Sequence, residues 1–173
     1  MFNLALLRWA LILPLLEMPV NAFIVLYFHD VVGLNAVVAS STLLIIIISS
    51  FVGKALLPLL LRITTGMRLL KIGVWIGLAS FAAFLLLPNV LVKCALLAIF
   101  SLVESSWHTL AQAYATQPGK SGVVLSVTSL ISPVTSFLPL LVGVIAAQAG
   151  LGWGLAALLA GPTAAGILLI TSR

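Results

Sequence analysis

Apolar runs of membrane-spanning length alternate with short polar breaks along the whole chain. A helix needs about 20 apolar residues to cross a bilayer. On this basis the pattern predicts six transmembrane helices, at residues 4–28, 36–61, 69–87, 90–115, 122–149 and 153–171. The breaks between them contain turn formers such as Pro88-Asn89 and the segment QPGKSG at 117–122. The sequence therefore predicts an all-α polytopic membrane protein with a single six-helix domain over residues 1–173.

Composition supports a membrane protein and excludes nucleic acid as a partner. Of the 173 residues, 63% are hydrophobic and 6% are charged, whereas about a quarter of the residues in a soluble domain are charged. The net charge is +5, but the basic residues stand singly at the ends of apolar runs. That placement is typical of helix ends at a bilayer surface. The expected partner is thus the lipid bilayer.

The basic residues also predict the orientation of the helices. Arg8, the hinge at 62–71, Lys120 and Arg173 would all lie on one side, and only Lys93 would lie near the other. Because cytoplasmic ends carry an excess of Lys and Arg, both termini are expected in the cytoplasm. We read the first helix as retained rather than as a cleaved signal peptide. The short hinge is expected to bring the second and third helices back side by side.

The hinge carries a resemblance to a known family. The segment GKALLPLLLRITTGMRLLKIG at 53–73 is similar to the loop signature of the major facilitator superfamily, roughly G-x-L-A-D-R-x-G-R-R-x-x-L. Arg62, Gly66 and Arg68 match it, and Leu61 stands where the family has Asp. The segments 27–36 and 112–153 resemble the first outer turn and the fourth-to-fifth helix region of a half.

This resemblance implies one six-helix half of a secondary transporter, most similar to the C-terminal half, built from two inverted three-helix repeats. It implies a small solute as substrate and a prokaryotic plasma (inner) membrane as location. It also implies a partner, either a separate second half or a second copy, because a single half would leave the faces of Glu17 and Glu104 towards lipid.

Five polar residues are the candidates for substrate or ion translocation. On α-helical geometry Glu104, His108 and Gln112 span about 80° of one face of the fourth helix. Glu17 and Asn21 share a face of the first helix. In the family resembled, these two helices line the central cavity, and transporter sites lie near the midplane. Glu104 beside His108 then predicts proton coupling. The alternative is that these groups bond neighbouring helices or pair with Lys54.

Other side chains are assigned to packing or to the membrane surface. A stripe of small residues on the fifth helix lets helices approach closely; it includes Gly122, Ser126, Ser129 and Ser136. The four tryptophans are expected to face lipid or the interface, with Trp107 also a candidate ligand contact.

No catalytic residue, cofactor or metal site is predicted. His108 lacks the serine motif of an intramembrane protease, a paired-His haem site needs a second His at membrane depth, and the lone Cys94 forms no metal cluster. The chain is therefore not expected to be an enzyme. Two alternatives to transport stay open: a six-helix substrate-binding subunit of a multi-component uptake complex, and a non-transporting membrane scaffold.

Overall fold

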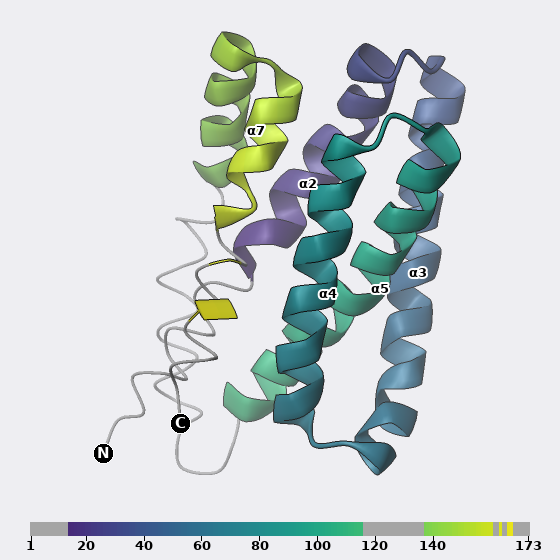
Figure 1. Cartoon of the computed structure of the whole chain (residues 1–173), viewed down its shortest axis with the longest axis vertical. Coiled ribbons are helices and arrows are strands. Elements are labelled where there is room, and N and C mark those ends of the chain that lie inside the picture. The colour runs from purple at the N-terminus through teal and green to yellow at the C-terminus, as the bar shows by residue number, and fades with distance from the viewer. Residues whose placement is uncertain (1–13, 116–136, 161–162, 164–165, 168–173) are drawn as a thin grey trace.

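The computed structural model describes residues 14–115, 137–160, 163 and 166–167, with side chains given except at 14–19, 108 and 111–115. The described residues form six helices, the first of which ends in a π-helical turn. In order these are α2 (Pro14–Leu26) with its π-turn η1 (Tyr27–Val31), α3 (Ala36–Ile63), α4 (Gly66–Leu86), α5 (Val90–Ala115), the helix Phe137–Ala149, and α7 (Leu151–Ala157). In Figure 1, α3, α4 and α5 stand together as a bundle, and α2 crosses beside them.

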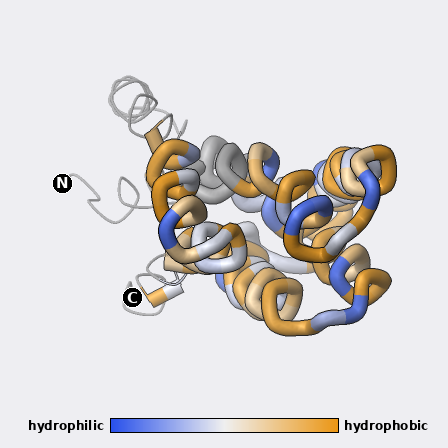
Figure 2. The backbone as a smooth tube through the Cα atoms, turned by 90° about the horizontal axis from the view of Figure 1, so that it is seen from above, coloured by the Kyte–Doolittle hydropathy of each residue, from blue (hydrophilic) through white to orange (hydrophobic). Residues whose placement is uncertain are grey.

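Three helices are long and apolar enough to cross a bilayer. They are Ala36–Ile63 with 28 residues, Gly66–Leu86 with 21, and Val90–Trp107, an 18-residue part of α5. The chain is thus an integral membrane protein of the helical class, as its apolar pattern predicts. Two further apolar helices, Val20–Val31 and Phe137–Ala149, are shorter within the described residues. Seen from above in Figure 2, hydrophobic residues occur on every described helix and hydrophilic positions are few.

α5 is the central helix of this bundle. It packs along both α3 and α4, whereas α3 and α4 touch each other little. The expectation that the short hinge brings α3 and α4 into side-by-side contact is therefore wrong, although the hinge does join their ends. The physical reason lies in the small residues, which on both helices face α5.

The contact between α3 and α5 is close because Gly53 has no side chain. A Cβ at Gly53 would collide with the backbone carbonyl of Leu102 and with the hydroxyl of Ser105. Nearby, Ser50 Oγ donates a hydrogen bond of 3.4 Å to the carbonyl oxygen of Ser101. The two backbones thus approach as closely as small residues allow in membrane helix pairs.

On the other side of α5, Trp107 fits against two glycines of α4. A Cβ at Gly73 would lie 2.6 Å from Trp107 Nε1, and one at Gly77 would lie 2.6 Å from Cη2 of the same ring. Gly73 and Gly77 form a G-x-x-x-G pattern, which creates a groove on a membrane helix. The indole occupies that groove.

The hinge between α3 and α4 is only two residues long. Thr64 and Thr65 are extended, with φ/ψ of −139°/161° and −76°/143°, and α4 begins directly at Gly66. β-branched residues such as Thr favour extended backbone. The predicted break between the helices 36–61 and 69–87 is therefore shorter in the structure, because α3 ends later and α4 begins earlier than expected.

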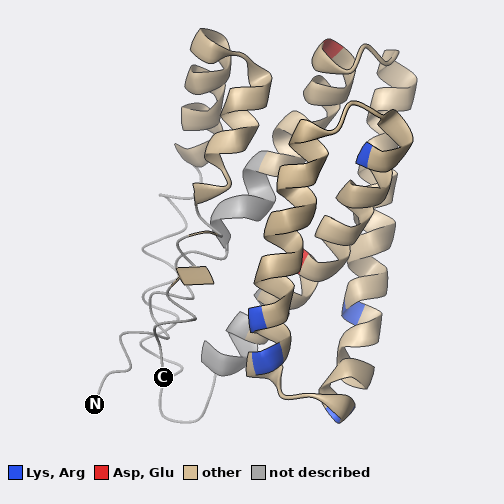
Figure 3. Ribbon diagram, in the orientation of Figure 1, with Lys and Arg blue, Asp and Glu red and all other residues tan. Residues whose placement is uncertain are grey.

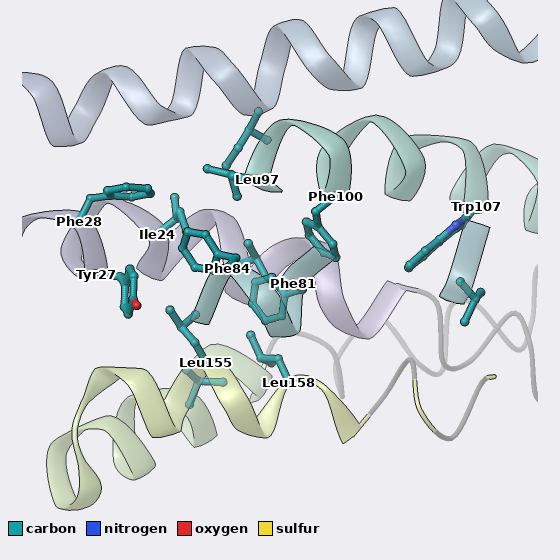
Figure 4. Packing of buried hydrophobic residues seen from close by; sticks show 14 of the residues in the cluster. Ile24, Tyr27, Phe28, Phe81, Phe84, Leu97, Phe100, Trp107, Leu155 and Leu158 are labelled. Atoms are coloured by element: carbon teal, nitrogen blue, oxygen red, sulfur yellow. The ribbon is translucent and has the colours of Figure 1, made fainter. Parts of the chain in front are cut away.

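Aromatic rings form a continuous line through the middle of the fold, as Figure 4 shows. Ring centroids are 5.2 Å apart between Tyr27 and Phe84, 4.9 Å between Phe81 and Phe100, and 6.4 Å between Phe100 and Trp107. Each of these rings is almost fully buried. The line joins η1, α4 and α5, so these three elements share one apolar core.

The π-turn positions two of these aromatic residues. The amide of Val32 donates to the carbonyl of Tyr27, five residues back, at 3.1 Å. The wider turn accompanies the burial of the adjacent side chains of Tyr27 and Phe28, which are 3% and 0% exposed. π-turns in proteins frequently occur at functional sites. Gly33, with φ of +79°, then reverses the chain towards α3.

Candidate functional site

The face of α5 that points into the bundle carries the candidate site. Lys93, Leu97, Ser101 and Glu104 recur every three or four residues along this face, and all four are buried. Lys93 and Glu104 are 11 residues apart in the sequence, so they lie about 20° apart around α5 and about 16 Å apart along it. Ionisable side chains are almost never this buried without a specific role.

Glu104 lies just past the middle of α5, inside the apolar stretch Val90–Trp107 that is long enough to cross a membrane. It is the 15th of the 26 residues of α5, which places it about 21 Å from the start of the helix. The hydrocarbon core is about 30 Å thick. Three buried serines, Ser101, Ser105 and Ser106, surround its position on the same helix. A carboxyl group at this depth is a functional-site hypothesis by default.

The hydroxyl groups of these serines are turned back towards their own helix. Ser105 Oγ donates to the carbonyl of Leu102 at 2.9 Å, and Ser106 Oγ donates to the same oxygen at 3.5 Å. A hydroxyl group that donates one hydrogen bond can still accept another through its oxygen. This stretch of α5 therefore combines one group able to take up and release a proton with hydroxyl oxygens that accept hydrogen bonds.

The structure places Glu104 differently from what the sequence predicts. Glu104 is 9% exposed, so a single copy of the chain already covers it and does not leave it towards lipid. The reason is the central place of α5, which packs along both α3 and α4. Asn21, in contrast, is exposed on α2.

Several predicted site residues cannot be compared in this way. The side chains of Glu17, His108 and Gln112 lie outside the described part of the structure, and their roles stay predictions. The same holds for the small-residue stripe, whose members Gly122, Ser126, Ser129 and Ser136 lie in the segment 116–136.

Trp107 corrects the expectation that the tryptophans face lipid. It is 2% exposed, and its Nε1 has no hydrogen-bond acceptor among the described residues. Trp75 and Trp153 are 43% and 70% exposed, as expected of lipid-facing rings. The G-x-x-x-G pattern of α4 is the sequence feature that marks the contact between α4 and the Trp107 ring.

The basic residues of the hinge are exposed at one end of the bundle. Arg62 ends α3 and Arg68 lies in the first turn of α4, both exposed, while Gly66 is partly buried at the start of α4. Figure 3 shows Lys and Arg positions gathered at this end. Lys54 is also exposed on α3, so its stem can reach along the helix to the membrane surface. The structure therefore places Lys54 on the outside of the described bundle.

Lys93 is a site residue that the sequence pattern did not reveal. Its side chain is 5% exposed. Nζ donates to the hydroxyl of Tyr27 at 2.7 Å and to the carbonyl of Phe84 at 2.6 Å. It also lies 4.9 Å from the ring centre of Tyr27 and 4.8 Å from that of Phe84. Both rings attract a cation at this distance.

Pro88 explains why the ammonium group of Lys93 enters the bundle. The carbonyl of Phe84 would normally accept from the amide of residue 88, but proline has no N–H. The ammonium group of Lys93 supplies the missing donor near the C-terminus of α4, where a cation is also favoured by the helix dipole. The Pro88-Asn89 pair therefore breaks the helix and creates the binding partner of Lys93.

The described residues contain no group of three or more His, Cys, Asp or Glu that could hold a metal ion. In comparisons with known proteins, no family model, no curated protein and no solved structure matches this chain.

Proposed function

We propose that this chain is a secondary transporter, or half of one, of the major facilitator type. It moves a small solute along a path lined by α2 and α5, with proton movement coupled through Glu104. Six membrane helices arranged as two inverted three-helix repeats, in a prokaryotic inner membrane, complete the proposal. The resemblance of the hinge and the placement of the basic residues support it.

The observation that carries the proposal is the buried carboxyl group of Glu104 within an apolar stretch of α5 that is long enough to cross a membrane. Placing a charged group there costs about 2.5–3.5 kcal/mol on insertion scales. A purely structural α5 would avoid that cost with an apolar residue at this position. Transporters place coupling groups near the midplane between repeats, and in the proposed arrangement Glu104 stands on the first helix of the second repeat.

A second half or a second copy of the chain remains part of the proposal. The reason is no longer the exposure of Glu104 but the exposure of other residues. Glu104 is covered within one chain, but Asn21 and many apolar side chains of α3 are exposed. A facing half would complete the path beside α2. Lipid covers the remaining apolar surface.

Purified protein reconstituted in liposomes should carry substrate, and accumulation should follow an imposed pH gradient. A small-solute library with and without the gradient is the direct measurement, and empty liposomes are the control. Binding without flux would instead indicate the substrate-binding subunit of an uptake complex. Neither binding nor flux would indicate a scaffold and would contradict the proposal.

The proposed orientation, with the hinge in the cytoplasm, depends on Arg62 and Arg68. Lys93 lies at the opposite end of the bundle, but it is buried and so adds no exposed positive charge there. We expect Arg62→Gln with Arg68→Gln, together with a Lys inserted beside His29, to weaken or invert this orientation. Because Cys94 is the single cysteine, Cys94→Ser gives a background without thiols. Thr65→Cys and Ala36→Cys then report the two ends.

In intact cells a membrane-impermeant thiol reagent should label Ala36→Cys and spare Thr65→Cys, and the charge variant should lose this contrast. If Thr65→Cys stays protected after the charges are moved, charge does not set the orientation. Labelling of Thr65→Cys in the unaltered background would place the hinge outside and overturn the assignment.

A further inference from the structure

We infer that Lys93 and Tyr27 form a binding site for the carboxylate of a small organic anion. The site lies at the end of the bundle opposite the basic hinge, where η1, the end of α4 and the start of α5 meet. It does not depend on the proposed transport, because the bound carboxylate need not be the transported solute.

The first argument is that Lys93 has no counter-ion among the residues that the structure describes. The whole sequence contains three acidic side chains, Glu17, Asp30 and Glu104. Asp30 Oδ1 is bonded to His29 Nδ1 at 2.6 Å, and both side chains are about half exposed. Lys93 makes no ion pair among the described residues.

The other two carboxyl groups are too far away along their helices. Glu104 lies about 16 Å from Lys93 along α5. Glu17 lies ten residues before Tyr27 in the sequence, which is about 15 Å of helix. A buried ammonium without a counter-ion is strongly destabilised relative to water, and the aromatic rings supply only partial compensation. An anion from outside the chain would remove this imbalance.

The second argument is that two hydrogen-bond donors converge at this point. An ammonium group has three N–H donors, and the structure assigns two of them, to Tyr27 and to Phe84. The hydroxyl of Tyr27 accepts one of these bonds and keeps its own proton to donate. Nζ and the phenolic oxygen are 2.7 Å apart. The two oxygens of a carboxylate can each accept from one of them.

The third argument concerns the field of α5 itself. The backbone of Lys93 lies in the first turn of α5, whose positive end favours an anion, while its ammonium group reaches the C-terminal end of α4. The neighbouring residues His29, Asp30 and Asn89 are exposed. The site therefore lies close to the exposed end of the bundle.

Sodium acetate is the probe for this site. We expect it to raise the thermal midpoint of the purified chain saturably, relative to sodium chloride at equal ionic strength, because a ligand that binds the folded state stabilises it. Lys93→Met should abolish the rise. Lys54→Met removes an exposed Lys from α3 and should leave the rise unchanged, which controls for net charge.

Tyr27→Phe keeps the aromatic ring and Lys93 but removes the phenolic hydrogen-bond donor. This variant tests the carboxylate site if Lys93→Met does not fold. The apparent affinity for acetate should fall by about tenfold, the effect of losing one hydrogen bond to a charged group. The inference is overturned if wild type shows no saturable difference between acetate and chloride. It is equally overturned if Tyr27→Phe, and Lys93→Met where it folds, respond to acetate as wild type does.

Discussion

Glu104→Gln is expected to abolish uphill, pH-driven accumulation of substrate while substrate exchange across the membrane continues. Glutamine keeps the shape and the hydrogen-bonding capacity of the side chain but cannot take up or release a proton. In a coupled transporter the charged and neutral forms favour different states of the protein. If residue 104 cannot take up a proton, the pH gradient cannot shift the equilibrium between these two states of the protein. The accumulation ratio of the substrate should then fall to one.

The measurement is uptake into liposomes with an imposed pH gradient, set beside counterflow without one. Thr109→Ala is a matched control, because it removes a hydroxyl from the same stretch of α5 whose bond goes to the carbonyl of Ser105 on its own helix. It should leave accumulation intact. Normal uphill transport in Glu104→Gln, with a normal pH profile, would make Glu104 a packing residue and direct attention to Glu17.

Gly53→Ala is expected to destabilise the protein severely. The added methyl group would meet the backbone carbonyl of Leu102 and the hydroxyl of Ser105, and a backbone atom cannot move aside as a flexible side chain can. Overpacking of this kind typically costs about 1–3 kcal/mol, and occasionally more. The opposing gain from replacing Gly by Ala in a helix is at most about 1 kcal/mol.

The thermal midpoint in detergent and the yield of monodisperse protein measure this effect. Gly152→Ala is the control: it adds the same methyl group near the start of α7, where a Cβ would have no atom within 4 Å. It should be neutral or slightly stabilising. Equal midpoints for the two variants would show that α3 and α5 are not packed as closely as described.

The apolar pattern predicts α3, α4 and α5 well and their neighbours poorly. Pro88-Asn89 marks the start of α5 to the residue, because Asn89 Oδ1 accepts from the amide of Leu91 at 2.9 Å and caps the helix. The pairing of α5 with α3 and α4 depends instead on where glycines meet larger side chains. The short loop between α3 and α4 therefore determines which helices pack together less than the fit of the glycines to the side chains of α5 does.

The candidate site was found only in part for a similar reason. Glu104 is conspicuous in the sequence because a carboxyl group in an apolar run always needs an explanation. Lys93 near a helix end resembles an ordinary surface anchor, since sequence position alone does not distinguish a buried lysine from an exposed one. Its burial requires Pro88 to free the carbonyl of Phe84, and Tyr27 to arrive from a distant helix through a π-turn.

The glycine contacts also determine the order in which the chain can assemble. α3 and α4 leave the ribosome first and are joined by two residues, yet they share little surface of their own. Until α5 enters the membrane, the notch at Gly53 and the groove at Gly73 and Gly77 are filled only by lipid. α5 then supplies Leu102 to one side and Trp107 to the other in a single step. Most of the contact surface of the three-helix bundle therefore forms only when α5, its last member, is in place.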